Sequence, residues 1–258
     1  MKTFLTLLAL ACTGANACAA DFGNDDLVRQ GRVVFDKRFT QAEQDRIKPL
    51  IVGALDQVTA FYGERRGDMP DFYFCKSVEC AKHLAGAEWR SFTLSKGGLR
   101  YHDGKYWFER PSIVITSTAR KNVSDERIQS TLAHELSHVE VSARAGRFDV
   151  PAWFNEGLAT VVGGAKCKPG EQGIDDLAKL KVSDVWHEYT KPSAGKTNAT
   201  YCQAGMEVQA WAERHGGARG VVDLLASLPK KSFESMYGPF VAPQGATQAA
   251  TVAENNDH

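Results

Sequence analysis

The strongest structural signal in this sequence is a helical pattern over residues 124–144. Ser124 is a typical helix N-cap, two acidic residues follow it in the first turn, and Gly146 stands just beyond the last turn. Apolar residues, among them Leu132 and Leu136, recur at helical spacing along one side of this segment. We therefore expect a long amphipathic helix that packs one side against a hydrophobic core.

The other side of this expected helix carries His134 and His138, with Glu135 directly after the first histidine. Residues four apart share one face of a helix, so both imidazoles can reach a single metal ion. A lone histidine would more often be an ordinary core or surface side chain. Two histidines in the pattern H-E-x-x-H, within a helix, favour a zinc site with a glutamate beside it.

A catalytic zinc ion usually has three protein ligands and one open position. The metzincin layout, with a third histidine six residues after His138, is excluded because Arg144 stands there. Glu156 lies on the next expected helix, residues 149–162, in an apolar stretch where an unpaired carboxylate would be costly to bury. We therefore expect His134, His138 and Glu156 to hold one zinc ion.

These two motifs resemble those of the gluzincin zinc peptidases, the group that includes thermolysin-like enzymes and zinc aminopeptidases. The resemblance covers residues 125–164 and is carried by H-E-L-S-H at 134–138 and N-E-G-L-A at 155–159. It implies a zincin-like fold, one catalytic Zn2+ held by the three ligands named above, and Glu135 as the general base of peptide hydrolysis.

Two features depart from the family pattern. Thr160 stands where thermolysin-type enzymes have an aspartate that supports a histidine ligand, so this support is expected to be weaker or to come from another residue. No exopeptidase sequence similar to G-A-M-E-N is present. The second departure argues against an aminopeptidase.

Hydrolysis of an amide also needs a hydrogen-bond donor for the developing oxyanion. Related enzymes commonly use a tyrosine or histidine of the helical lobe, and the candidates here are Tyr201, Tyr189, His187 and His215. We favour Tyr201, at the expected start of a helix and beside Cys202, as the second catalytic residue. A tyrosine that simply packs in the core is the alternative.

The helix expected at 124–144, which carries both histidines, is called the metal helix below. In the rest of the sequence, the expected strands precede the metal helix and most of the expected helices follow it. The expected strands are residues 31–39, 71–75, 90–94, 98–102 and 106–116. The other expected helices are residues 40–62, 78–84, 182–189, 201–215, 221–228 and 232–237. This order indicates an α+β fold, with a small mixed sheet and the metal helix in a lobe of about 21–145 and a helical lobe of about 146–240. A strand within 90–108 should lie beside the metal helix and pair with an extended substrate.

The N-terminus has the features of a secretory signal. Lys2 precedes an apolar run at residues 4–11 that is too short to span a bilayer, and small residues follow at 15–20. We expect residues 1–20 to be removed on export to a bacterial periplasm or the outside medium, with a lipid anchor at Cys12 or Cys18 as the alternative. No later segment predicts a transmembrane helix. Residues 241–258 are small and polar and are expected to be disordered.

Removal of the signal leaves four cysteines, which can form two disulfides in three ways. We favour a local pair, Cys75–Cys80, and a longer pair, Cys167–Cys202. A zinc knot that uses Cys75 and Cys80 lacks a second close pair of ligands, so disulfides are the better interpretation in an oxidising compartment.

The balance of charged residues limits the classes of molecule that the protein is expected to bind. The 31 basic and 31 acidic residues give a formal net charge of +0, which argues against a nucleic-acid-binding protein. The sequence thus predicts a secreted zinc metallopeptidase that acts on peptides or proteins. The alternatives are a non-catalytic zinc-containing binding protein on a peptidase fold and a zinc amidase that acts on cell-wall cross-links.

Overall fold

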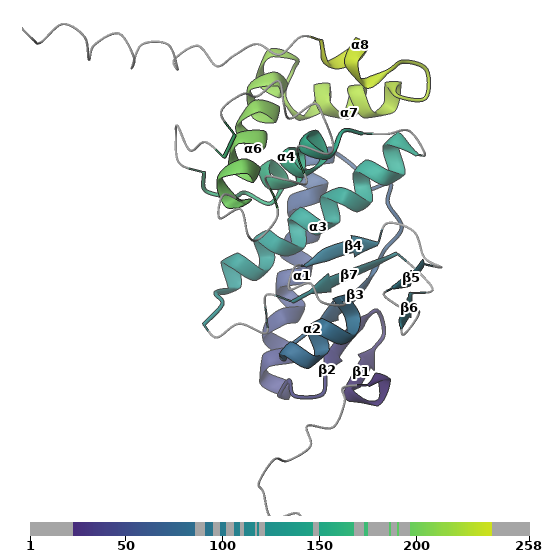
Figure 1. The fold of residues 1–258 in the computed structure, drawn as a ribbon, viewed down its shortest axis with the longest axis vertical. Coiled ribbons are helices and arrows are strands. Elements are labelled where there is room, and N and C mark those ends of the chain that lie inside the picture. The colour runs from purple at the N-terminus through teal and green to yellow at the C-terminus, as the bar shows by residue number, and fades with distance from the viewer. Residues whose placement is uncertain are drawn as a thin grey trace, which may run out of the picture.

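A computed structural model of the protein describes residues 23–85, 91–94, 99–101, 106–108, 111–116, 118, 122–146, 150–167, 173–174, 186, 190 and 197–238. The expected signal segment, the expected C-terminal tail and most of the expected helix at 182–189 lie outside these residues. The described part is α+β: strands and two long helices make up the N-terminal half, and helices make up the C-terminal half (Figure 1).

A mixed sheet underlies the N-terminal half. Its strand order is β1-β2-β3-β7-β4, with β2, β3 and β7 parallel and an antiparallel strand at each edge. The strands are β1 (Leu27–Gln30), β2 (Val33–Asp36), β3 (Asp71–Phe74), β4 (Phe92–Leu94) and β7 (Ser112–Ile115). A separate antiparallel pair consists of β5 (Leu99–Tyr101) and β6 (Tyr106–Phe108).

Two predicted strands had the wrong bounds. The expected strand at 106–116 is two strands in different sheets, and Pro111 lies between them. Proline has no N–H to donate to a ladder, although its carbonyl accepts a hydrogen bond from the Asp71 N–H at 2.8 Å. The expected strand at 31–39 is too long at both ends. Gly31, with φ 62°, belongs to the turn between β1 and β2, and β2 ends at Asp36.

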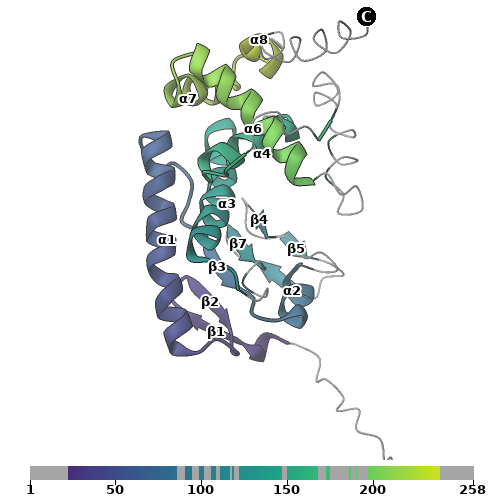
Figure 2. The ribbon, with the colours of Figure 1, turned by 90° about the vertical axis from the view of Figure 1, so that its left-hand side faces the viewer.

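Helices cover both faces of the sheet (Figure 2). α1 (Gln41–Tyr62) and α3 (Asp125–Ala145) lie on one face, and α2 (Val78–Ala85) lies on the other. Because side chains alternate along a strand, each strand contributes to both cores. The α1–α3 side receives Phe35, Phe74 and Ile115, and the α2 side receives Val34, Tyr73 and Val114.

The C-terminal half packs onto α3. It consists of α4 (Ala152–Val162), α6 (Thr197–Arg214), α7 (Ala218–Ser227) and α8 (Phe233–Tyr237), grouped at the end of the molecule away from β1 and β2 (Figure 1). In its core, Trp153 and Phe154 make edge-to-face contacts with Phe233 and Tyr237. The same hydrophobic cluster continues through α3 to the sheet, so the two halves share one core.

A buried polar network fixes α3 against the end of α1. The hydroxyl groups of Tyr62 and Ser137 are hydrogen-bonded at 2.8 Å. One turn further, the Glu140 carboxylate accepts two backbone N–H groups of the turn that follows α1 and lies beside the Arg144 guanidinium. Glu140 and Arg144 are both buried, and the Arg65 guanidinium also lies 3.5 Å from Glu140, so the buried carboxylate is compensated by two cations. The network sets the position of the helix that carries the two histidines.

Both expected disulfides are present: Cys75–Cys80 and Cys167–Cys202, with Cα–Cα distances of 5.4 and 5.3 Å. Paired cysteines of this kind are typical of an extracellular or otherwise oxidising environment. Among the helices that the structure describes, none has both the length and the apolar character needed to cross a membrane.

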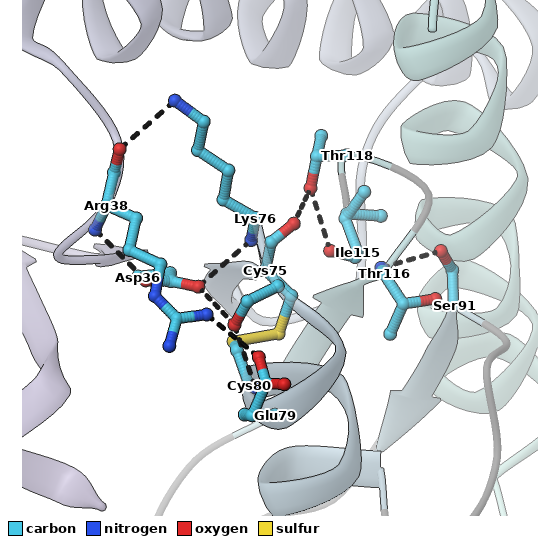
Figure 3. Close-up of a disulfide and its surroundings, with 11 residues drawn as sticks. Asp36, Arg38, Cys75, Lys76, Glu79, Cys80, Ser91, Ile115, Thr116 and Thr118 are labelled. Atoms are coloured by element: carbon cyan, nitrogen blue, oxygen red, sulfur yellow. Dashed lines mark hydrogen bonds and ion pairs between the residues drawn. A yellow bond between two sulfur atoms is a disulfide. The ribbon is translucent and has the colours of Figure 1, made fainter. Parts of the chain in front are cut away.

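The Cys75–Cys80 disulfide ties α2 to the carboxyl ends of the parallel strands (Figure 3). The buried Asp36 carboxylate, at the end of β2, accepts hydrogen bonds from the Lys76 N–H at 3.2 Å and the Ser77 hydroxyl at 2.9 Å. Ser77 in turn accepts the Cys80 N–H in the first turn of α2. The Cys75–Cys80 disulfide therefore helps to attach α2 to the sheet, on the far side of the sheet from α3.

Candidate metal centre

α3 presents the two histidines on one face, as the spacing predicts. Its ends agree with the sequence: the Ser124 hydroxyl accepts a hydrogen bond in the first turn, and Gly146 follows the last turn with φ 67°. Leu132 and Leu136 are buried in the core, whereas His134 and His138 are only partly buried. Their Nε2 atoms lie 3.3 Å apart and point toward the same place.

α4 brings the third ligand to this place. Pro151 precedes the helix, and Trp153, Phe154 and Leu158 are buried, which fixes the helix against the core. Glu156 lies on the side that faces α3. Its Oε2 atom is 3.1 Å from Nε2 of His134 and 3.4 Å from Nε2 of His138.

The three predicted ligands thus form one cluster, with one atom from each side chain within reach of a common centre. His134, His138 and Glu156 could together hold a metal ion.

Asn155 orients one of the ligands, a role that we did not predict. The His138 Nδ1–H group donates a hydrogen bond to the Asn155 Oδ1 atom at 2.9 Å. A proton on Nδ1 leaves the lone pair of the neutral ring on Nε2, toward the cluster. The only signal in the sequence was the position of Asn155 directly before Glu156.

The cluster has an electrostatic need for a cation. Burial lowers the pKa of His138, but the charge of Glu156, its hydrogen bond and the nearby charge of Glu135 raise it to about 9. Burial raises the pKa of Glu156, but the opposing effect of His138 and His134 is larger and lowers it. Without a metal ion, the Glu156 carboxylate is therefore compensated by a proton on His138. A divalent cation can replace that proton.

Glu135 is buried on α3, next to His134 and outside the three-ligand cluster. Its effect on the pKa of His138 shows that its charge acts at the metal centre. The Glu135 carboxylate therefore lies beside the three candidate ligands, at the position that the H-E-x-x-H pattern gives it.

Thr160 has a local role instead of supporting a ligand. Its hydroxyl donates a hydrogen bond to the backbone carbonyl of Glu156 at 2.8 Å. Within the described part of the chain, the hydrogen bonds of His134 all involve its Nε2 atom. The two histidines therefore differ: Asn155 orients His138, and no described side chain orients His134 through Nδ1.

Tyr201 lies against the cluster. Its ring centroid is 6.0 Å from that of His134 and 5.3 Å from that of the buried Trp186. The predicted helix start at Tyr201 was wrong, because α6 begins at Thr197 and Tyr201 lies one turn inside it.

Of the other candidates for the oxyanion donor, His215 is described by the structure and does not lie at the cluster. His215 follows the far end of α6, roughly 20 Å along the helix axis from Tyr201. Its Nδ1–H donates to the Trp211 carbonyl, and its ring stacks on that of Trp211. His187 and Tyr189 lie outside the described residues.

The expected strand beside the metal helix is β4. It contacts α3 and forms one edge of the sheet among the strands that the structure describes. The pairing of a substrate with this strand stays a prediction.

Comparison with known proteins adds no family to these observations: no family model, curated protein or solved structure matches the chain. The candidate function therefore depends on the site itself.

Proposed function

We propose that this protein is an exported zinc metallopeptidase of the gluzincin type. The observation that carries the proposal is the convergence of His134, His138 and Glu156 from two helices, with Glu135 beside the first histidine. A partly buried site of two imidazoles and one carboxylate leaves a fourth position for water or substrate, which is the arrangement of catalytic zinc sites.

The spacing of the ligand atoms supports zinc. Ligands at 2.0–2.1 Å from a tetrahedral ion are separated from one another by about 3.3–3.4 Å. The three separations in the cluster are 3.1, 3.3 and 3.4 Å. Mixed nitrogen and oxygen donors suit zinc, whereas calcium and magnesium prefer oxygen ligands alone.

The chain supplies the groups that peptide hydrolysis needs. Bound zinc would lower the pKa of a coordinated water to about 7 and polarise the substrate carbonyl. Glu135 accepts the proton of the attacking water and delivers it to the leaving amine. Asn155 keeps His138 in the tautomer that directs Nε2 to the ion. Tyr201, beside His134, donates a hydrogen bond to the developing oxyanion.

The proposal places the enzyme outside the cytoplasm. The two disulfides support an oxidising compartment, and residues 1–20 have the pattern of an export signal. A bacterial periplasm or the outside medium satisfies both requirements.

The test is a pair of matched substitutions on α3. Glu135→Gln should keep a full equivalent of zinc, measured by elemental analysis, and should lower cleavage of a proteome-derived peptide library by at least about 100-fold. Glu126→Gln makes the same chemical change on an exposed residue of the same helix and should leave cleavage unchanged.

Equal cleavage by the wild type and Glu135→Gln would remove the proposed mechanism. A wild-type protein that holds zinc, is inert on the peptide library and captures a protein partner would be a non-catalytic binding protein. Release of cell-wall peptides without cleavage of linear peptides would indicate a zinc amidase.

A further inference from the structure

The beginning of α6 is packed together with a short piece of the preceding sequence. Gln203 accepts hydrogen bonds from the N–H groups of Gly173 and Ile174 at 3.0 and 2.9 Å, and donates one to the Ile174 carbonyl at 2.7 Å. Gly173 lies directly on Thr200, because a Cβ atom at Gly173 would stand 2.1 Å from the Thr200 hydroxyl oxygen. Ile174, Thr200 and Gln203 are buried, so this contact is a fixed part of the fold.

The Cys167–Cys202 disulfide joins the same part of α6 to the end of α4. Cys202 lies between Thr200 and Gln203 in the sequence, and Cys167 follows shortly after the last turn of α4. Since α4 carries Glu156, the disulfide links the helix of the third metal ligand to the beginning of α6. A cross-link over a sequence separation of 35 residues restricts the relative position of its two ends.

Tyr201 lies between these anchors in the sequence, and its ring lies near that of the candidate ligand His134. Three rings lie in series: Trp186, Tyr201 and His134, with centroid distances of 5.3 and 6.0 Å. Trp186 is only 3% exposed, so it has little freedom to move away from Tyr201. A tyrosine ring turns about two side-chain torsions. The disulfide and Gln203 fix its backbone, and Trp186 restricts its ring.

We propose that Trp186 and the Cys167–Cys202 disulfide are positioning groups that hold the Tyr201 hydroxyl at the metal centre. This inference rests on the proposed function, in which Tyr201 donates a hydrogen bond to oxygen atoms of a bound ligand. A donor that is already oriented costs no reorganisation when charge develops, and a misplacement of about 1 Å can lower a rate by about 100-fold.

Binding of acetohydroxamate to the zinc-loaded full chain tests this inference without requiring peptidase activity. This small chelator binds metal ions through two oxygen atoms, which a neighbouring hydroxyl group can reach. Tyr201→Phe should weaken its binding by about 10-fold, the value of one hydrogen bond to a charged group. Trp186→Ala and the double variant Cys167→Ser/Cys202→Ser should each weaken it by about 5- to 10-fold, with the zinc content unchanged.

The decisive comparison combines these changes with Tyr201→Phe. If the groups act through Tyr201, Trp186→Ala should change binding by less than about 2-fold in the Tyr201→Phe background. The same holds for the disulfide variant. Full additivity in that background would overturn the inference, as would unchanged binding in Tyr201→Phe.

Conservative and remote variants separate positioning from a general loss of structure. Trp186→Phe keeps an aromatic ring and should stay within about 3-fold of the wild type. Cys75→Ser/Cys80→Ser removes the disulfide on the far side of the sheet and should leave binding unchanged. If Trp186→Ala does not fold, Trp186→Leu, compared with Trp186→Phe, gives the same contrast between apolar volume and ring.

Peptide cleavage by the same variants keeps the two proposals distinguishable. Coupling of Trp186 to Tyr201 in acetohydroxamate binding, without any cleavage, would uphold the positioning and remove the peptidase function. Cleavage by the wild type, without coupling, would uphold the peptidase and remove the positioning. Where both hold, Trp186→Ala should lower kcat by about 10-fold or more, with a much smaller change in KM.

Discussion

The ring of His138 illustrates how a side chain becomes a metal ligand. Its Nδ1–H donates to Asn155, its Nε2 lies 3.3–3.4 Å from the other two ligand atoms, and the negative charges around it favour a bound cation. The first effect acts through Nδ1, the second through Nε2, and the third through the electrostatic potential of the neighbouring carboxylates. The hydrogen bond to Asn155 can therefore be removed while the ligands stay in place.

Asn155→Ala should lower the affinity for zinc by about 10- to 100-fold, because His138 loses the partner that orients its ring. Competition with a coloured chelator measures this affinity. Asn155→Asp keeps an acceptor oxygen and should bind zinc at least as tightly as the wild type. Equal affinity in Asn155→Ala and the wild type would show that the hydrogen bond has no influence on the site.

At the scale of elements, the crossing of α4 and α6 decides whether Glu156 and Tyr201 can reach one site. Gly157 lies at this crossing, and a Cβ atom there would meet the Ala204 backbone at 2.6 Å and the Val208 side chain at 3.0 Å. The two helices can approach this closely only because Gly157 has no side chain. Backbone atoms on the other helix cannot move aside independently of the helix.

Gly157→Ala should therefore destabilise the protein by about 1–3 kcal/mol, because α6 must shift away from α4. Gly53→Ala is the matched control. It lies inside α1, where the added Cβ atom meets only the flexible end of the Gln129 side chain. There the higher helix propensity of alanine should make the change neutral or stabilising by up to about 1 kcal/mol. Urea unfolding measures both, and similar values for the two would exclude the tight crossing as the cause.

The metal centre also connects the two halves of the molecule, because its ligands come from one helix of each half, α3 and α4. In the metal-free protein the pKa of His138 is raised from 6.5 to about 9. A raised pKa stabilises the fold fully below about pH 6.5, and this contribution is lost as the pH rises to about 9. Zinc replaces the proton, so the loaded protein should not show this loss.

The melting temperature should therefore fall between pH 6.5 and pH 9 in the metal-free protein, by about 4–8 °C for a loss of about 2 kcal/mol, and much less in the zinc-loaded protein. Zinc should also raise the melting temperature at every pH in this range. His138→Gln should abolish the pH dependence of the metal-free protein. His215→Gln, at a histidine outside the cluster, should retain it. Parallel pH profiles with and without zinc would contradict the role of His138.

Local patterns predicted much of the secondary structure. The helices expected at 40–62 and 124–144 begin at the caps Thr40 and Ser124, the first with a capping box, and Gly146 ends the second, because a cap is satisfied by residues next to it in the chain. Errors arose where the local pattern is ambiguous. The turn at Gly31 and the break at Pro111 were merged into neighbouring strands, since short apolar runs do not show where one ladder ends and the next begins.

By itself, the sequence predicted the α+β class and the three candidate ligands and favoured the disulfide pairs that the structure has, because helical spacing and residue chemistry already limit what those residues can do. Only the tertiary structure decided that the ligand atoms meet within 3.4 Å, that Asn155 orients His138, and that Tyr201 lies against His134. These relations depend on how α3, α4 and α6 cross, and the crossing is set by packing between residues far apart in the chain.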